Sequence, residues 1–209
     1  ATSLPTGAGT DTWPAWSPDG RQIAWRKDIG GAGCTELWLM DVSGANQRKL
    51  PLPAGIQPCQ FAWSPDGKEL ALEANGGIWL VGVDGVAFRA LSPNCTLAGG
   101  CTAPVYTGVK WNHAATRLAF SGAESGSQSS VNVIGRDGTG FVTATFVTGG
   151  NSTYPDWSPD DSRLAFQAFD PADPTGSALP LVIVTGDASV QNLQYGRPGV
   201  WAAGPRWRP

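Results

Sequence analysis

The sequence predicts an all-β fold, a β-propeller with four complete four-stranded blades and parts of a fifth. The first observation is a repeat: the tryptophan of a short motif returns at Trp16, Trp63, Trp111, Trp157 and Trp207, 46 to 50 residues apart. The second is that each full copy is followed by an alternating apolar segment and then by a second pair of strand-like segments. A period in the forties with four strands per unit is typical of propeller blades, because one such sheet buries its faces only against neighbouring sheets.

The composition agrees with this fold class. The chain has 209 residues, of which 41% are hydrophobic and 15% charged, with 28 Gly and 17 Pro. This is a turn-rich composition, and the length suits a single domain over residues 1–209. The net charge of −3 and the lack of a Lys/Arg cluster make a nucleic-acid partner unexpected. No apolar stretch has the length of about 18–20 residues that a membrane span needs.

The repeated motif predicts a tight hairpin connection. It reads W-S-P-D-G at Trp16–Gly20 and Trp63–Gly67, W-S-P-D-D at Trp157–Asp161, and W-N-H-A-A at Trp111–Ala115. Proline presets φ at the first central position of a turn, aspartate bonds nearby backbone N–H groups, and glycine accepts a positive φ. The third copy loses the Pro-Asp-Gly signal, so the sequence does not fix the geometry of its turn.

Four blades follow from the spacing of the segments. The second strand pair of each unit is expected at 36–42 with 47–50, 78–83 with 87–91, 131–134 with 141–145, and 181–184 with 190–193. The blades are therefore expected at about 13–50, 60–91, 108–145 and 154–193.

The two ends of the chain resemble outer pieces of a fifth blade. Residues 1–12 resemble the last strand of a unit, and residues 205–209 resemble a first strand. Such a blade lacks its two middle strands, which leaves three interpretations. The chain is cut from a longer propeller, its edges are covered by a partner chain or a neighbouring copy, or the ring is small and irregularly closed.

The four cysteines favour an oxidising compartment. Cys34, Cys59, Cys95 and Cys101 all lie outside the predicted strand cores. We favour the pairs Cys34–Cys59 and Cys95–Cys101, one of three possible connectivities. A zinc site and free cytosolic thiols are the alternatives, although no C-x-x-C pair or neighbouring histidine supports zinc.

The motif carries a family resemblance. W-S-P-D-G-[RK]-x-[IL]-A-[WFL], followed about 20 residues later by [IL]-W-[LV]-x-x-x-D-G, resembles the TolB-type β-propeller repeat over almost the whole chain. That repeat occurs in the periplasmic TolB protein, in actinobacterial surface lipoproteins and in the propeller domains of prolyl-oligopeptidase-like peptidases. The resemblance implies a binding or gating surface outside the cytoplasm. It does not specify a function, because the motif residues are turn and packing residues.

No catalytic constellation is evident in the sequence. His113 is the sole histidine and occupies a turn position, and no G-x-S-x-G nucleophile motif is present. We expect no enzyme activity, no cofactor and no metal. The weaker alternative is a cation-binding loop around Asp170 and Asp173.

Variable loops on one face of the predicted propeller are the candidate binding surface. Loops that a rigid scaffold positions are where binding residues concentrate. The candidate binding residues are Tyr106, Tyr154, Phe169, Asp170 and Asp173, and Trp201 is the candidate for a carbohydrate-binding channel mouth. The alternative is that these loops merely cover the blades and the channel.

The functional hypothesis is a non-catalytic, periplasmic or secreted module that presents loops to a protein partner, or an accessory subunit of a larger assembly. The first alternative is the propeller of a prolyl-oligopeptidase-like peptidase whose catalytic domain lies beyond Pro209. The second alternative is a carbohydrate-binding propeller. More W-S-P-D-G units or a G-x-S-x-G segment downstream would separate the first two classes.

Overall fold

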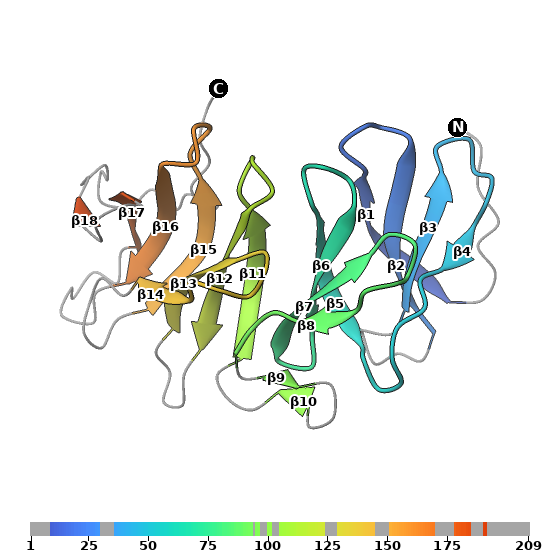
Figure 1. The fold of residues 1–209 in the computed structure, drawn as a ribbon, viewed down its shortest axis with the longest axis horizontal. Coiled ribbons are helices and arrows are strands. Elements are labelled where there is room, and N and C mark those ends of the chain that lie inside the picture. Colours follow the sequence, from blue (N-terminus) through green and yellow to red (C-terminus); the bar gives the residue numbers. More distant parts are fainter. Residues whose placement is uncertain are drawn as a thin grey trace.

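The computed structural model contains four antiparallel four-stranded sheets and one two-stranded ribbon. It describes residues 9–29, 36–93, 95–96, 100–101, 105–123, 129–144, 151–169, 178–184 and 190–191. The sheets stand side by side in chain order, with the first and the fourth at opposite ends of the row (Figure 1). Among the described residues, no helix has the length and apolar character that crossing a membrane requires.

Each blade is a simple meander of four consecutive strands. The first contains β1 (Thr10–Trp16), β2 (Gln22–Asp28), β3 (Glu36–Asp41) and β4 (Arg48–Lys49). The second contains β5 (Pro58–Trp63), β6 (Glu69–Ala74), β7 (Gly77–Gly82) and β8 (Arg89–Ala90). The ribbon of β9 (Cys95–Thr96) and β10 (Gly100–Cys101) follows.

The other two blades repeat this order. The third contains β11 (Val105–Trp111), β12 (Arg117–Ala123), β13 (Ser129–Gly135) and β14 (Val142–Ala144). The fourth contains β15 (Asn151–Trp157), β16 (Arg163–Phe169), β17 (Ala178–Val184) and β18 (Val190–Gln191). The predicted set of four four-stranded blades is confirmed.

The first strand of the first blade starts earlier than the sequence predicts. Residues Thr10–Thr12 were expected in a fifth blade, yet they pair with β2 as the beginning of β1. The pairing is interrupted between Thr12 and Ala15 by a bulge, and Trp13 within it has a φ of 56°. The bulge breaks the alternation of side chains, so the sequence pattern ended the strand too soon. Residues 1–8 and 205–209, the rest of the predicted fifth blade, lie outside the described residues.

The W-S-P-D-G motif forms the hairpin connection that the sequence predicts. In the second copy, the Ser64 hydroxyl donates to Asp66 Oδ1 at 2.6 Å and accepts from the backbone N–H of Glu69 at 3.0 Å. The N–H of Gly67 donates to the carbonyl of Ser64 at 2.8 Å. Gly67 has a φ of 69°, in the left-handed region that favours glycine. The hydrogen bonds of Ser64 and Asp66 therefore hold the turn closed.

The third copy replaces this serine with Asn112. Its side-chain oxygen accepts from the backbone N–H groups of Thr116 and Arg117 at 2.8 and 2.7 Å, and its carbonyl accepts from Ala115 at 3.0 Å. Ala115 has a φ of 56° at the position of the missing glycine. An asparagine thus performs the role of serine, and the turn keeps its form without the Pro-Asp-Gly sequence.

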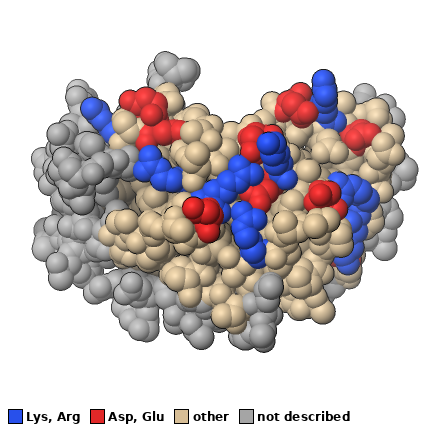
Figure 2. Space-filling view, in the orientation of Figure 1, with Lys and Arg blue, Asp and Glu red and all other residues tan. Residues whose placement is uncertain are grey.

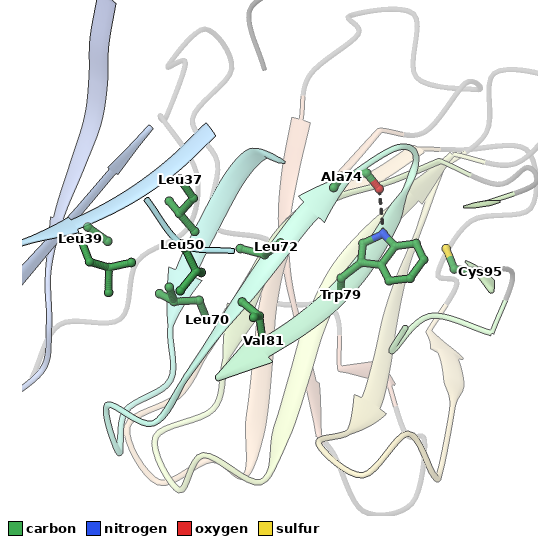
Figure 3. Packing of buried hydrophobic residues seen from close by; sticks show 10 residues of the cluster. Leu37, Leu39, Leu50, Leu70, Leu72, Ala74, Trp79, Val81 and Cys95 are labelled. Carbon is green, nitrogen blue, oxygen red and sulfur yellow. Dashed lines mark hydrogen bonds between the residues drawn. The ribbon is translucent and has the colours of Figure 1, made fainter. Parts of the chain in front are cut away.

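The hydrophobic core consists of the contacts between neighbouring blades. Between the first two blades, Leu37, Leu39 and Leu50 pack with residues that include Leu70, Leu72 and Trp79 (Figure 3). Trp79 is fully buried, and its Nε1 donates to the carbonyl of Ala74 at 3.0 Å. Equivalent clusters join the second blade to the third and the third to the fourth. Face-to-face packing of this kind is what stabilises a repeat architecture.

Two of the predicted disulfide cysteines lie in strands, Cys59 in β5 of the second blade and Cys95 in β9 of the ribbon, although the sequence predicts them outside the strand cores. Cys59 and Cys95 are in the disulfide-bonded form. The ribbon aligns Cys95 with Cys101, which agrees in register with one of the favoured pairs. Cys34 and the side chain of Cys101 lie outside the described residues. The connectivity therefore stays a prediction.

Candidate functional site

The first strands of the four blades form the inner side of the row, because β1, β5, β11 and β15 lie next to one another in turn. Three large aromatic side chains are exposed on these strands: the motif residue Trp16, and Trp13 and Tyr154 outside the motif. Trp13 is 60% exposed and Tyr154 is 63% exposed. Both lie three residues before a motif tryptophan, so they occupy the same place in the repeat.

The backbone holds both aromatic residues in an unusual conformation. Trp13 and Tyr154 each have a φ of 56°, which costs a residue other than glycine about 1–3 kcal/mol. In the fourth blade the register passes from Thr153 to Asp156 across the bulge that contains Tyr154. The N–H of Tyr154 donates to Ser121 Oγ of the third blade at 3.1 Å, so the neighbouring blade fixes this bulge.

The repeat itself does not require an aromatic residue at this position. The third blade has Gly108 there, with a φ of 70°, and the second has Gln60 next to a shorter bulge. Packing between blades therefore leaves the choice of side chain open. The two aromatic residues are candidates for binding, since strained and exposed residues on a rigid scaffold concentrate at functional sites.

A second candidate is an open groove of about 740 Å³ at the junction of the second and third blades. It is lined by Arg89, Arg117 and Arg136 together with residues of the hairpin connections. Arg136 contacts Glu69 and Asp66 at 2.7 Å each, and Arg89 contacts Glu69 at 2.6 Å. Acidic and basic side chains alternate across the middle of the face shown in Figure 2.

The charged side chains in this groove pair across the junction between the second and third blades. Burial tends to raise the pKa of Asp66, but hydrogen bonds from Ser64 and Arg136 outweigh it and lower the pKa to about 2. The carboxylate therefore stays ionised and paired with Arg136 over the physiological range. Arg136 also lies 5.5 Å from the ring centre of Trp111. Because Arg89 and Arg136 are engaged with carboxylates, the groove is a weaker binding candidate than the exposed aromatic pair.

The predicted binding residues do not come together as one site. Tyr154 is exposed, as a binding residue must be. Tyr106 corrects an expectation: it is 5% exposed within β11 and packs edge-on against Phe120, with ring centres 4.9 Å apart. The β11 strand begins before Tyr106, so its ring faces the second blade instead of a loop. The side chain of Phe169, and all of Asp170, Asp173 and Trp201, lie outside the described residues.

Other polar candidates behave as turn residues. The side chain of His113 is 59% exposed and its Nδ1 lies 2.8 Å from Asp161 Oδ1. Among the residues that the structure describes, no three His, Cys, Asp or Glu side chains are grouped as a metal site would need. Sequence reasoning missed Trp13. The recurrence of an aromatic residue three places before the motif in the first and fourth copies is the signal that identifies it.

Comparisons with known proteins match parts of much longer chains. No family model matches the chain. Over 61 residues the chain is 41% identical to "Tol-Pal system protein TolB" of Zymomonas mobilis. This match covers 29% of this chain and 13% of that protein. Over 72 residues the chain is 36% identical to "Uncharacterized peptidase YuxL" of Bacillus subtilis. This match covers 34% of this chain and 10% of that protein. The matches thus span about a tenth of each relative.

A solved structure matches nearly the whole fold. The structure of a putative TolB from Agrobacterium tumefaciens has a TM-score of 0.65 at 19% identity, and the match covers 88% of this chain and 61% of that one. At this identity the likeness concerns the fold. Together with the repeated motif and the four blades, the comparisons identify the chain as a TolB-like β-propeller.

Proposed function

We propose that this propeller is a non-catalytic interaction module that works outside the cytoplasm and binds a protein partner. The observation that supports this most is the exposure of Trp13 and Tyr154 at one repeat position. Aromatic side chains are enriched at the energetic centres of protein interfaces, because they bury a large area with few rotatable bonds. A partner that contacts the inner strands would find these rings already in place.

The strained backbone adds to this argument. The left-handed conformation at Tyr154 is held by the hydrogen bond from its N–H to Ser121, so the ring cannot relax into the blade without breaking that contact. A side chain fixed before binding loses less conformational entropy when the partner arrives. Strain of this kind persists where the surrounding structure enforces it, and it is common in binding sites.

The proposed location rests on cysteine chemistry and on the relatives. Disulfide-bonded Cys59 and Cys95 suit a periplasmic or extracellular compartment. Relatives that share about 40% of residues over one segment carry the name of the Tol-Pal system. A role for this chain as an accessory subunit of a larger assembly follows by analogy with that name.

The second candidate function is the propeller of a peptidase. The identity of 36% over 72 residues to a segment of the YuxL peptidase favours it. In this case the propeller would bind or admit peptides for a catalytic domain on another part of the polypeptide. A third possibility is carbohydrate binding, for which exposed tryptophan and tyrosine rings also provide stacking surfaces.

A capture experiment tests the proposal. The purified chain is immobilised and exposed to a periplasmic extract of its own host. Bound proteins are then measured for the wild type, for Tyr154→Ala, and for Val142→Ala as a control. Val142 is 55% exposed on β14, away from the first strands. We expect a specific partner whose affinity falls at least about tenfold in Tyr154→Ala and is unchanged in the control.

Other outcomes contradict the proposal. A partner held equally by the wild type and Tyr154→Ala would exclude the aromatic position as the binding site. Reaction of the natural full-length polypeptide with a fluorophosphonate probe for serine hydrolases would favour the peptidase function. Binding to glycans in an array, without a protein partner, would favour the carbohydrate-binding class.

A further inference from the structure

The guanidinium group of Arg26 lies beside the exposed ring of Trp13. The two residues are neighbours across β1 and β2, because Thr12, which precedes Trp13, is paired with Arg26 in the register of these strands. The guanidinium carbon of Arg26 lies 5.8 Å from the centre of the Trp13 ring. Trp13 is 60% exposed, so the cation covers only a part of the ring and leaves the rest accessible.

Hydrogen bonds to two blades hold Arg26 in this position. Its Nε donates to Thr12 Oγ1 at 3.2 Å, and its Nη1 donates to the carbonyl of Cys59, in β5 of the second blade, at 2.6 Å. Trp13 is held by the bulge of β1, where it has a φ of 56°. The cation and the ring are therefore fixed relative to each other before a ligand arrives, which lowers the entropic cost of binding.

The charge of Arg26 is not neutralised within the described part of the chain. None of the ion pairs between described residues includes Arg26. Asp11 on the neighbouring strand accepts from Trp25 Nε1 at 2.9 Å and lies 3.5 Å from Lys27 Nζ instead. A guanidinium has five N–H donors, and the two hydrogen bonds of Arg26 use two of them. Because Thr153 Oγ1 is the sole buried side-chain polar atom without a partner among the described residues, the other donors of Arg26 reach solvent.

The repeat itself does not require a cation at this position. The residue ten places after the motif tryptophan is, in blade order, Arg26, Glu73, Ser121 and Gln167. Glu73 is 5% exposed and accepts from the N–H of Val109 at 2.8 Å, so it belongs to the junction with the third blade. Beside Tyr154, the other exposed ring outside the motif, the residue is the neutral Gln167. Of these four positions, the one next to Trp13 alone carries a positive charge.

We propose that the protein partner presents an acidic side chain next to an apolar one, with the carboxylate paired to Arg26 and the apolar side chain packed on the ring of Trp13. This inference rests on the proposed function and adds the chemistry of the partner. A guanidinium with open N–H donors binds a carboxylate through parallel hydrogen bonds. One uncompensated positive charge suits one carboxylate, and the indole beside it offers apolar area that an acidic side chain alone would leave uncovered.

Selection from a phage-displayed library of random peptides on the immobilised chain tests this proposal without a host protein. The most enriched peptide is synthesised with a fluorescent label, together with an amide version in which Asn or Gln replaces each acidic residue. Affinities are measured by fluorescence anisotropy. We expect the enriched peptides to place Asp or Glu beside an apolar residue. The wild type should bind the acidic peptide at least about tenfold more tightly than the amide version.

Three variants assign the contacts. Arg26→Gln should bind the acidic peptide at least about tenfold more weakly than the wild type does, and the amide peptide equally well. Equal binding of the amide peptide separates a lost charge from a lost structure, and thermal melting establishes that each variant is folded. Trp13→Ala should weaken both peptides, because both make the apolar contact. Arg21→Gln is the matched control: it removes the same charge from the same blade, at a side chain that is 86% exposed, and should change neither affinity.

Three results would overturn the proposal. These are enriched peptides without acidic residues, an acid preference that persists in Arg26→Gln, and a library that yields no peptide dependent on Trp13. The peptide selection uses no host protein, so its failure is distinct from a failure of the proposed function. Capture of a partner that depends on Tyr154 but not on Arg26 would retain the proposed function and exclude this inference. Peptides with an Arg26-dependent acid preference, without a captured partner, would support the chemistry of the site and contradict the proposed partner.

Discussion

Asp161 in the fourth blade binds the backbone of His113 in the third. Its Oδ1 accepts from the His113 N–H at 2.8 Å, and its Oδ2 accepts from the Ala114 N–H at 2.8 Å and from the Asn112 amide at 3.0 Å. Asp161 stands where the first two copies have glycine, and His113 and Ala114 stand where the other copies have proline and aspartate. The two copies that depart from the motif therefore compensate for each other across their junction.

We expect Asp161→Gly to destabilise the protein although glycine suits the backbone there. Asp161 has a φ of 57°, so glycine relieves strain, but three donors of the third blade lose their acceptor. The net loss should be about 1–3 kcal/mol in the free energy of unfolding, measured by urea titration. Ala115→Gly, at the same position of the third copy with a φ of 56°, is the control and should change stability by less than about 1 kcal/mol. An unchanged free energy of unfolding in Asp161→Gly would show that the hydrogen bonds accepted by Asp161 are dispensable.

Acid should weaken the junction between the second and third blades. Burial tends to raise the pKa of Asp66, yet hydrogen bonds from Ser64 and Arg136 lower it from 3.8 to about 2. A carboxyl whose folded pKa is depressed stabilises the protein above its unfolded pKa, and this contribution is lost as the pH falls through the folded value. These two pKa values define a window from about pH 5 down to about pH 2. Within it, the measured free energy of unfolding should fall less steeply with falling pH in Asp66→Asn than in the wild type.

Glu73 should have the opposite pH dependence. Burial raises the pKa of Glu73 above 4.5, although hydrogen bonds from the N–H groups of Val109 and Gly108 act against it. A carboxyl with a raised folded pKa stabilises the protein below its unfolded pKa, and this contribution is lost as the pH rises through the folded value. Glu73→Gln keeps an acceptor for Val109 without a buried charge. We expect it to be more stable than the wild type at pH 7, with the difference vanishing at acidic pH; equal pH profiles would contradict this.

The motif tryptophans should differ sharply in their contribution to stability. Trp157→Ala removes a side chain that is 2% exposed between the third and fourth blades, and should cost about 3–5 kcal/mol. Trp16→Ala removes the same residue type where it is 59% exposed, and should cost less than about 1 kcal/mol in the monomer. Chemical denaturation at low protein concentration separates these values. Equal losses would mean that Trp16 packs within the monomer.

Arg136 should contribute more than an ordinary surface arginine. It contacts Asp66 and Glu69 of the second blade and is 26% exposed, so Arg136→Ala leaves Asp66 without its cationic partner and Glu69 with Arg89 alone. The expected loss is about 1–3 kcal/mol. Arg21→Ala is the control: its side chain is 86% exposed, it lies 3.9 Å from Asp19, and its loss should stay below about 0.5 kcal/mol. A comparable effect of both variants on thermal melting would contradict a structural role for the cluster.

The repeat was readable in the sequence because its residues act locally. Serine, aspartate and glycine close their turn within five residues, and the alternating segments that follow report the two faces of each strand. Tyr106 was misjudged, and Trp13 was missed, for the opposite reason. A bulge reverses the alternation of side chains, and the bulges of β1 and β11 show in the pairing register but not in the pattern of residues.

The sequence alone determined the all-β class, the four four-stranded blades and the TolB-like repeat, since a fixed period and turn chemistry do not depend on distant contacts. Tertiary structure decided which members of the repeat are buried. Trp16 and Trp157 carry the same motif, and a preceding blade covers one and not the other. It also decided that Asp161 completes the turn around His113, because residues 48 positions apart meet only when the blades stack.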